Sequence, residues 1–220
     1  MEATALKLTA EETTDRGRLQ RIFNYVRDIN FAFPVEGDFV SASETIRLGY
    51  GQCNTKSTLL LALCRAAGIP ARIHFSLINK EIQRGPFRGF LYRLIPEAIS
   101  HSWIEVEIDG EWRQVDSFIN DLAFHRGAVA EIRRRGWQTG FSVTRVGGEP
   151  SAELDLDGKH FSQMGAVTDD HGVWNDPADY YASDRYKNRP GRLKHWLYRW
   201  AILGANRRVS AIRRSGEQRT

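Results

Sequence analysis

Residues 49–70 read GYGQCNTKSTLLLALCRAAGIP, and they contain the longest apolar run that the chain places next to a glycine turn. A turn with two glycines leads into Cys53, after which leucines and alanines occupy nearly every direction around a predicted helix. Gly68 is typical of a residue that ends a helix, and Pro70 cannot continue one. Because a helix that is apolar on all sides is buried, we expect this one at the centre of the core, with Cys53 in its first turn.

The position of Cys53 indicates a chemical role. Unpaired N–H groups and the helix dipole favour negative charge in the first turn, so we expect a lowered pKa for the thiol. The backbone N–H of Cys53 is itself a candidate donor to an oxyanion. Cys64 lies eleven residues later, on nearly the same face but about 16 Å along the helix axis, and we interpret it as a core residue.

A second stretch, SHSWIEVEIDGEWRQVDSF over residues 100–118, predicts a β-hairpin with Asp109-Gly110 as its two-residue turn. In this register the numbers of opposed residues sum to 219, so His101 and Asp116 are diagonal neighbours on one face. Their Cβ atoms are then about 7 Å apart, and a slip of one residue would place them on opposite faces. Together with Cys53 they supply a nucleophile, a base and an acid that orients the base.

Flanking patterns predict the other elements. Capping-box spacing predicts a helix over residues 10–30 after Thr9, and a short helix between Ser41 and Gly49. The remaining signals predict a strand over 71–79, an ordered insertion over 80–99, a helix near 128–135, strands near 141–146 and 161–167, turns without a metal site over 167–181, and a basic helix after 191. Buried helices followed by antiparallel strands, without repeated βαβ units, favour the α+β class.

The runs ASETIRLGYGQCNTKSTLLLALCRAAGIPARI (42–73) and HSWIEVEIDGEWRQVD (101–116) resemble the core of the transglutaminase-like superfamily, over about a third of the chain. The resemblance implies a papain-like α+β fold, with the cysteine helix packed on an antiparallel sheet that carries the histidine and the aspartate. It implies Cys53 as nucleophile, His101 as general base and acid, and Asp116 as the group that orients His101. The implied reaction is acyl transfer on an amide or thioester carbonyl through a thioester acyl-enzyme, with no metal and no organic cofactor.

Eukaryotic transglutaminases bind the oxyanion with a tryptophan upstream of the cysteine, whereas all six tryptophans of this chain follow Cys53. The side-chain amide of Gln52 is a candidate substitute donor. Four aromatic residues are candidates for substrate contact, namely Phe87, Phe90, Tyr92 and Trp103. Three of them belong to the 80–99 insertion, which borders the cleft in a papain-like fold. The alternative for this insertion is a surface segment that buries its own aromatic side chains.

The net charge of +4 is unevenly distributed along the chain. Residues 187–220 contain ten Lys or Arg and one acid, so we predict a catalytic domain over 1–186 and a basic C-terminal helix and tail over 187–220. Apolar residues recur there at helical spacing, namely Leu193, Trp196, Leu197 and Trp200. We expect this tryptophan stripe to dock on the catalytic domain, with 207–219 solvated. A membrane surface or an acidic protein, such as a carrier that presents an acyl thioester, remains an alternative partner; nucleic acid is not expected.

Composition is typical of a globular protein, and two cysteines exclude a disulfide framework and a cysteine-rich zinc site. No leader-like start and no run of about 18 apolar residues occur, so we expect a soluble, cytoplasmic protein. The predicted function is that of a transglutaminase-like acyltransferase or an amidohydrolase or protease acting on a peptide, amide or thioester. Two alternatives are an enzyme that forms amide bonds from a carrier-bound thioester, and a non-catalytic binding module that acts through the basic tail.

Overall fold

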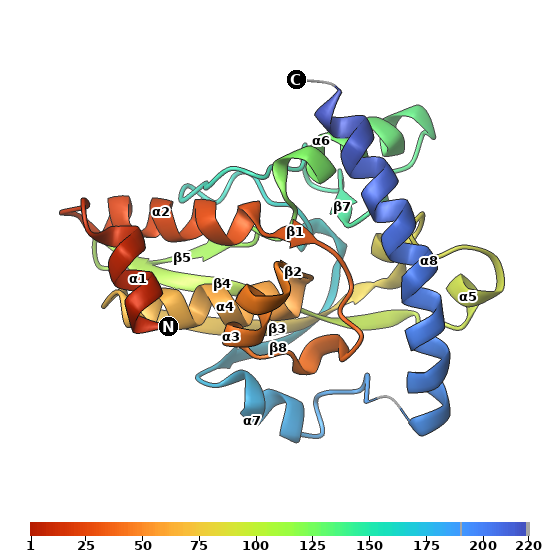
Figure 1. Cartoon of the computed structure of the whole chain (residues 1–220), viewed down its shortest axis with the longest axis horizontal. Helices are drawn as coiled ribbons and strands as arrows, with labels where there is room; N and C mark the ends of the chain where they lie inside the picture. The colour runs from red at the N-terminus through yellow and green to blue at the C-terminus, as the bar shows by residue number, and fades with distance from the viewer. Residues whose placement is uncertain (190, 219–220) are drawn as a thin grey trace.

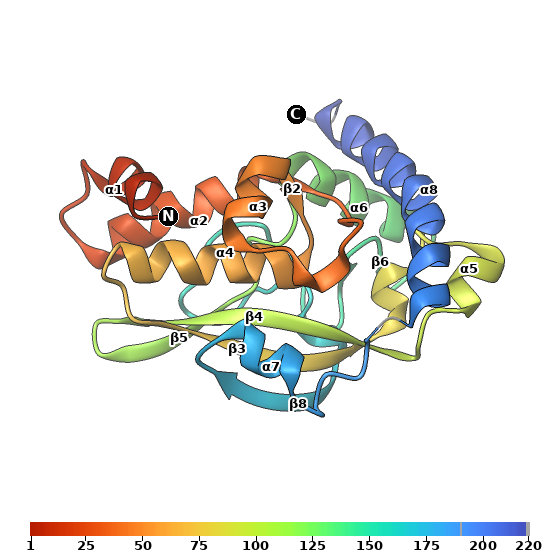
Figure 2. The same cartoon turned by 60° about the horizontal axis from the view of Figure 1, so that its bottom comes forward.

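A computed structural model describes residues 1–189 and 191–218, with the backbone alone for residues 192–195. Its centre is a four-stranded antiparallel sheet in the order β5-β4-β3-β8, with one buried helix, α4, packed on it (Figures 1 and 2). The bounds are Cys53–Ala66 for α4, Ala71–Asn79 for β3, Ala98–Ile108 for β4, Glu111–Val115 for β5 and Val167–Trp174 for β8. The predicted α+β class is confirmed.

Helix α4 begins and ends as its sequence predicts. Gln52 is the N-cap: its side chain accepts from the N–H of Asn54, and the side chain of Thr55 accepts from the N–H of Gln52. A side chain at Gly51 would meet the hydroxyl of Thr55 at 2.6 Å, which explains the glycine before the cap. Ten of its 14 residues are buried, so the helix is enclosed on most sides.

The N-terminal region differs from the prediction of one long helix. Two helices are present, α1 (Glu2–Thr9) and α2 (Asp15–Asp28). Thr9 ends the first, and Thr14 caps the second by accepting from Gly17, so the predicted capping box at Thr9 is wrong. The short helix α3 (Ala42–Leu48) is as predicted, capped by Ser41 and ended by Gly49 at a φ of 69°. Strand β1 (Asn30–Phe31) pairs with β2 (Tyr50–Gly51), which ties α2 to the turn before Cys53.

The hairpin has the predicted register. Ile108 pairs with Glu111 and Ile104 with Val115, so the numbers of opposed residues sum to 219. Asp109 and Gly110 both have positive φ values, 56° and 78°, as a two-residue turn between twisted strands requires. This register fixes which side chains share a face of the sheet.

The elements in the second half of the chain differ more from those expected from the sequence. Helix α6 (Leu122–Arg134) begins several residues earlier than expected, after its N-cap Asp121. The acidic run 167–181 is not a series of turns: it forms β8, which pairs with β3, and then helix α7. Most of β8 is not buried, so it lacks the alternating apolar pattern that announces a strand. The remaining elements are η1 (Gly37–Phe39), η2 (Lys80–Gln83), α5 (Gly89–Arg93), β6 (Thr139–Gly140), β7 (Val143–Thr144), η3 (Met164–Ala166), α7 (Pro177–Ala182) and α8 (Arg192–Glu217).

Helix α8 lies across one side of the body beside α5 and α6 (Figures 1 and 2). It packs through Ile202, Ala205 and Val209, while Trp196 and Trp200 are 56% and 65% exposed. The expectation that this stripe docks on the body is therefore wrong for the two tryptophans, because a neighbouring apolar stripe does so, while Leu197 is only 36% exposed. The side chain of Leu193, also assigned to that stripe, lies outside the described residues.

The end of α8 is packed against α6 rather than solvated. A side chain at Gly127 of α6 would meet the carbonyl oxygen of Ile212 at 2.2 Å, and one at Gly216 would meet that of Ala123 at 1.8 Å. Arg208 donates to the carbonyl of Pro86. The prediction that residues 207–219 are solvated is wrong for this part of the helix. In the part of the chain that the structure describes, no helix is both long and apolar enough to cross a membrane.

Candidate active site

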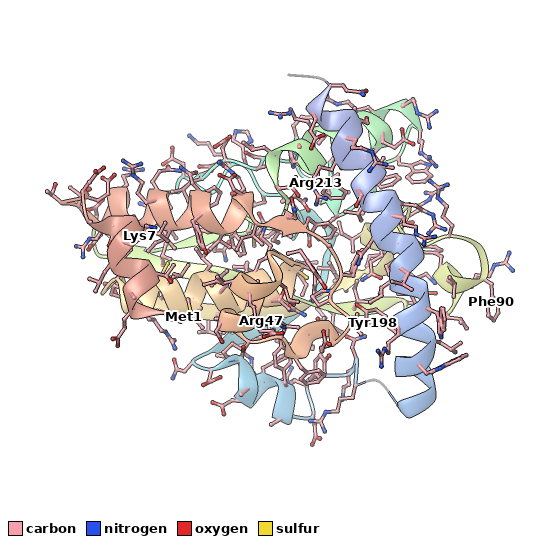
Figure 3. The ribbon with its side chains drawn as sticks, viewed as in Figure 1. Met1, Lys7, Arg47, Phe90, Tyr198 and Arg213 are labelled. Atoms are coloured by element: carbon pink, nitrogen blue, oxygen red, sulfur yellow. The ribbon has the colours of Figure 1, made fainter. Side chains whose placement is uncertain are left out.

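Cys53 lies at the first turn of α4, in the wall of a cavity of about 480 Å³. The opposite walls come from the insertion after β3 and from α8, including Tyr198, which Figure 3 shows on the side of α8 that faces the body. Cys53 is 8% exposed, whereas Cys64 has no exposed surface in the core. Of the two cysteines, only Cys53 can meet a molecule in the cavity.

A chain of hydrogen bonds holds the thiol. The thiol of Cys53 donates to Oε1 of Gln52 at 2.9 Å, and Nε2 of Gln52 donates to Oδ1 of Asp38 at 2.5 Å. The other oxygen of Asp38 accepts from the hydroxyl of Tyr186 at 2.8 Å. Gln52 is thus buried and bonded at both ends of its amide, next to the thiol.

The electrostatics of the thiol differ from the sequence-based expectation. Burial raises the pKa of Cys53 well above its ordinary value, and the carboxylate of Asp38 raises this pKa further. The backbone N–H groups of Asn54, Ser102 and Cys53 lower the pKa by a smaller amount. The expected lowering at the helix N-terminus is therefore outweighed, and the resting group is a neutral thiol.

His101 is fully buried on β4, and neither of its ring nitrogens has a hydrogen-bond partner among the described residues. Burial lowers the pKa of His101 to about 3, so its imidazole is neutral at pH 7. Its nearest aromatic neighbour is Trp103, with ring centroids 6.1 Å apart. An unpartnered buried polar atom typically lowers stability by about 1–3 kcal/mol, so this histidine is not there to stabilise the fold through a hydrogen bond.

Asp116 follows β5 and is also fully buried. Its carboxylate accepts the consecutive backbone N–H groups of Ser162, Gln163 and Met164, at 2.7, 2.7 and 3.0 Å. Burial raises the pKa of Asp116 to about 6, and the three N–H groups oppose this rise. Oδ1 accepts only one of these bonds, which leaves it the capacity for another donor.

The predicted hairpin register is observed from Ile104–Val115 to Ile108–Glu111, and His101 and Asp116 lie just beyond its last pair, so their placement as diagonal neighbours stays a prediction. Strand β5 ends opposite Ile104, so the stretch of β4 that contains His101 pairs with β3 on one side and has no β5 partner on the other. Asn54, the residue after Cys53, donates to the carbonyl of Ser100 and accepts from the hydroxyl of Ser102, which places the start of α4 beside this stretch. Among the described residues, no hydrogen bond joins Cys53, His101 and Asp116, and their assignment as a triad stays a prediction.

Of the four aromatic candidates for substrate contact, one lines the cavity and three lie elsewhere. Phe87 lines the cavity and packs against Phe33, with ring centroids 5.1 Å apart. The other three are not among the cavity-lining residues. Phe90 is 71% exposed at the tip of α5 (Figure 3), Lys80 covers the ring of Tyr92, and Trp103 stacks on His74 at 4.1 Å between centroids.

Sequence reasoning missed two residues of the site. Asp38, in the short helix η1 before α3, has no local motif, since its partners lie far away in the sequence. Burial raises the pKa of Asp38, and hydrogen bonds from Tyr186, Asn54 and Gln52 oppose the rise.

Lys56 is the second missed residue. It is fully buried one turn after Cys53, and its ammonium donates to the carbonyls of Arg27, Ile29 and Ile119 at 3.1, 2.9 and 2.9 Å. It therefore ties α4 to the end of α2 and to the segment after the hairpin. A lysine in a helix predicted to be buried is the sequence signal for such a role.

The fold and the site define a class: an α+β protein with a cysteine at the start of a buried helix, beside a hairpin that carries a histidine and an aspartate. A family model described as the transglutaminase-like superfamily matches residues 2–117, just over half of the chain. The chain belongs to the transglutaminase-like superfamily, which confirms the resemblance seen in its sequence.

Two solved structures are similar at low identity. A putative cysteine protease from Cytophaga hutchinsonii has 16% identity and a TM-score of 0.47, over 81% of this chain and 43% of its own. A putative protease from Parabacteroides distasonis has 15% identity and a TM-score of 0.39, over 56% of this chain and 23% of its own. The chain thus spans less than half the length of either protein. No curated protein matches it.

Proposed function

We propose that the protein is a cysteine-dependent enzyme of acyl transfer, an acyltransferase or an amidohydrolase, with Cys53 as nucleophile, His101 as base and acid, and Asp116 as the positioning carboxylate. The observation that carries this proposal is the buried His101 with two unpartnered ring nitrogens, on the strand β4 that packs against the helix of the cavity-lining Cys53. A purely structural histidine would be bonded to a neighbour. Membership of the transglutaminase-like superfamily supports the same roles.

The resting pair is neutral, so the thiol proton has to move during attack. The thiol turns from Gln52 toward His101, which takes its proton while the sulfur attacks an amide or thioester carbonyl. The protonated His101 then gives this proton to the departing amine or thiol, and a thioester on Cys53 remains. Water or an amine attacks the thioester and loses its proton to His101, which passes the proton to the departing thiolate of Cys53, so the acid or amide is released and the thiol is restored. Asp116 accepts a hydrogen bond from His101 at its less occupied oxygen.

The developing oxyanion needs donors near the thiol. The backbone N–H groups of Cys53 and Ser102 are candidates, because both act on the sulfur in the resting structure. Nε2 of Gln52 uses one hydrogen for Asp38 and has a second one for the oxyanion. Gln52 keeps its predicted role in this proposal, with Asp38 fixing the orientation of its amide.

The test is acylation by p-nitrophenyl acetate, followed as a burst of p-nitrophenolate and by the mass of the intact protein. The unmodified chain and the C64A variant should form one acetyl adduct on Cys53. The C53A variant should form none, and H101F should lose at least a hundredfold in rate. An undiminished burst in C53A would overturn the proposal and favour the non-catalytic alternative. Iodoacetamide should likewise label Cys53 well before Cys64.

A further inference from the structure

We propose that the cavity beside Cys53 binds the aliphatic chain of the acyl group, so that the substrate is a fatty-acyl ester, thioester or amide. The proposal rests on the proposed function for the reaction at Cys53, but the binding of the chain can be measured without that reaction. It begins from the way in which polar and apolar groups are distributed around the cavity.

Groups able to handle a carbonyl gather at one side of the cavity. Cys53, Gln52 and Asp38 form the hydrogen-bonded chain described above, and all three line the cavity. Much of the remaining wall is apolar and comes from the 31–33 segment, the 80–99 insertion and α8. The apolar lining residues include Phe33, Ile82, Phe87, Leu91 and Ile95, together with Ile78 at the end of β3.

Two polar side chains of the cavity wall are bonded to the protein itself. Gln163 donates to the carbonyl oxygen of Ser142, and Oδ1 of Asn188 accepts from the N–H of Ser100. Such a wall offers few partners to the backbone of a peptide. It suits a chain that needs none, because burial of apolar surface is then the main source of affinity. A volume of about 480 Å³ lies within the usual range of small-molecule sites.

The exposed part of the cavity wall combines apolar side chains with three charged ones, Glu36, Lys187 and Arg189. Leu94 of α5 is 50% exposed and Leu197 of α8 is 36% exposed, and both line the cavity. Helix α8 contributes Ala201 to the wall, where its methyl group leaves the cavity open. A larger side chain at this position would occupy space that we assign to the acyl chain.

The experiment is isothermal titration of the full chain with straight-chain carboxylates from butanoate to dodecanoate. The Kd should fall about threefold for each added methylene until the cavity is filled. A201F should weaken dodecanoate binding at least tenfold. A211F, the same change at an exposed position of α8 outside the cavity, should leave it unaltered. L94S, at an exposed wall position, should weaken binding severalfold even if A201F fails to fold.

The outcomes separate this inference from the proposed function. Dodecanoate binding that C53A retains, with no ester acylating Cys53, would support the acyl-chain site and overturn the reaction. Acylation by p-nitrophenyl acetate, together with carboxylate binding that is absent or independent of chain length, would overturn the acyl-chain site and leave the reaction in place. Dodecanoate binding by both A201F and L94S that is as tight as that of the unmodified protein would also overturn the site.

A separate observation concerns the outer face of α8, and we propose that this face binds an anionic lipid surface. Trp196, Trp200 and Leu203 are each more than half exposed, on the side opposite the buried stripe, and the two indole rings touch edge to face at 6.4 Å. Arg207 and Arg214 continue the exposed stripe toward the end of the helix. Indole rings beside arginines fit the interface of an anionic bilayer.

Sedimentation with vesicles tests this second proposal. The full chain should bind mixed phosphatidylserine and phosphatidylcholine vesicles, and salt should weaken the binding. The W196A/W200A and R207E/R214E variants should bind the vesicles at least tenfold more weakly. W112A, which removes a matched exposed tryptophan on the hairpin, should bind them as the unmodified protein does. Absence of binding to the mixed vesicles, or equal binding by W196A/W200A, would overturn the lipid surface and favour an acidic protein as occupant.

Discussion

Arg213 of α8 forms a buried ion pair with Asp121, the residue that caps α6, and the two side chains are 2.8 Å apart. Asp121 also accepts the N–H groups of Phe31 and Phe124, and Arg213 donates to the carbonyl of Phe31. The carboxylate of Asp121 thus connects α6, α8 and strand β1, whose residue Phe31 lines the cavity. The helix predicted to be a basic tail is part of the structure that forms the cavity wall.

Asp121→Ala should lower the free energy of unfolding by about 3–5 kcal/mol, because it leaves a buried guanidinium unpaired and removes the cap of α6. Urea unfolding followed by circular dichroism measures the loss. Glu149→Ala, which breaks ion pairs with Arg133 and Arg145 at the surface, should change stability by about 1 kcal/mol or less. Equal losses in the two variants would show that the Asp121 pair does not hold the helices together.

His101→Phe should be at least as stable as the unmodified protein at pH 7, because no hydrogen bond is lost with the ring nitrogens. The pKa of His101 falls from 6.5 to about 3 on folding, so the unfolded chain binds a proton that the native chain excludes. The contribution of the neutral His101 to the free energy of unfolding is therefore complete above pH 6.5. As the pH falls toward 3, this contribution, on the order of 4 kcal/mol, is lost.

Urea midpoints measured between pH 7 and pH 4 check this prediction. The urea midpoint should change less with pH in His101→Phe than in the unmodified protein. Asp116 acts in the opposite direction, since burial raises its pKa to about 6 and the native state keeps its proton more readily. A large loss of stability in His101→Phe at pH 7 would instead identify His101 as a structural residue.

The elements that the sequence predicts well are those fixed by local chemistry. The Asp109-Gly110 turn accepts two positive φ values and so sets the register of the hairpin. The leucine run bounded by Gly51 and Gly68 has no alternative to a buried helix. Helix α2 was predicted with the wrong start because Thr9 and Thr14 both have cap chemistry, and only packing selects between them.

The parts that were not predictable depend on distant partners. Asp38 is bonded to Gln52 and Tyr186, and no local pattern announces either contact. Helix α8 has two apolar stripes, and the sequence does not show which one the body covers. For the site, sequence and family relationship indicate the three residue types, while the balance between helix dipole and burial at Cys53 requires the three-dimensional surroundings.

Lys56→Met should lower the free energy of unfolding by about 3 kcal/mol or more. The ammonium is the donor to three buried carbonyls, and methionine fills its volume but satisfies none of them. Thermal and urea unfolding measure the change, with Lys7→Met on the exposed side of α1 as the control (Figure 3). A loss no larger than that of the control would mean that the three carbonyls have other partners.

Asp38→Asn should make Cys53 more reactive as a thiolate. The carboxylate of Asp38 raises the pKa of Cys53, second only to burial, and asparagine removes this charge while preserving the size of the side chain. The pH profile of Cys53 alkylation by iodoacetamide should shift to lower pH, with a rate roughly three- to tenfold higher at a given alkaline pH. Glu36→Gln, an acid at the same cavity without a bond to Gln52, should shift the profile less. A shift to higher pH in Asp38→Asn would show that the Gln52 hydrogen bond, and not the charge of Asp38, controls the thiol.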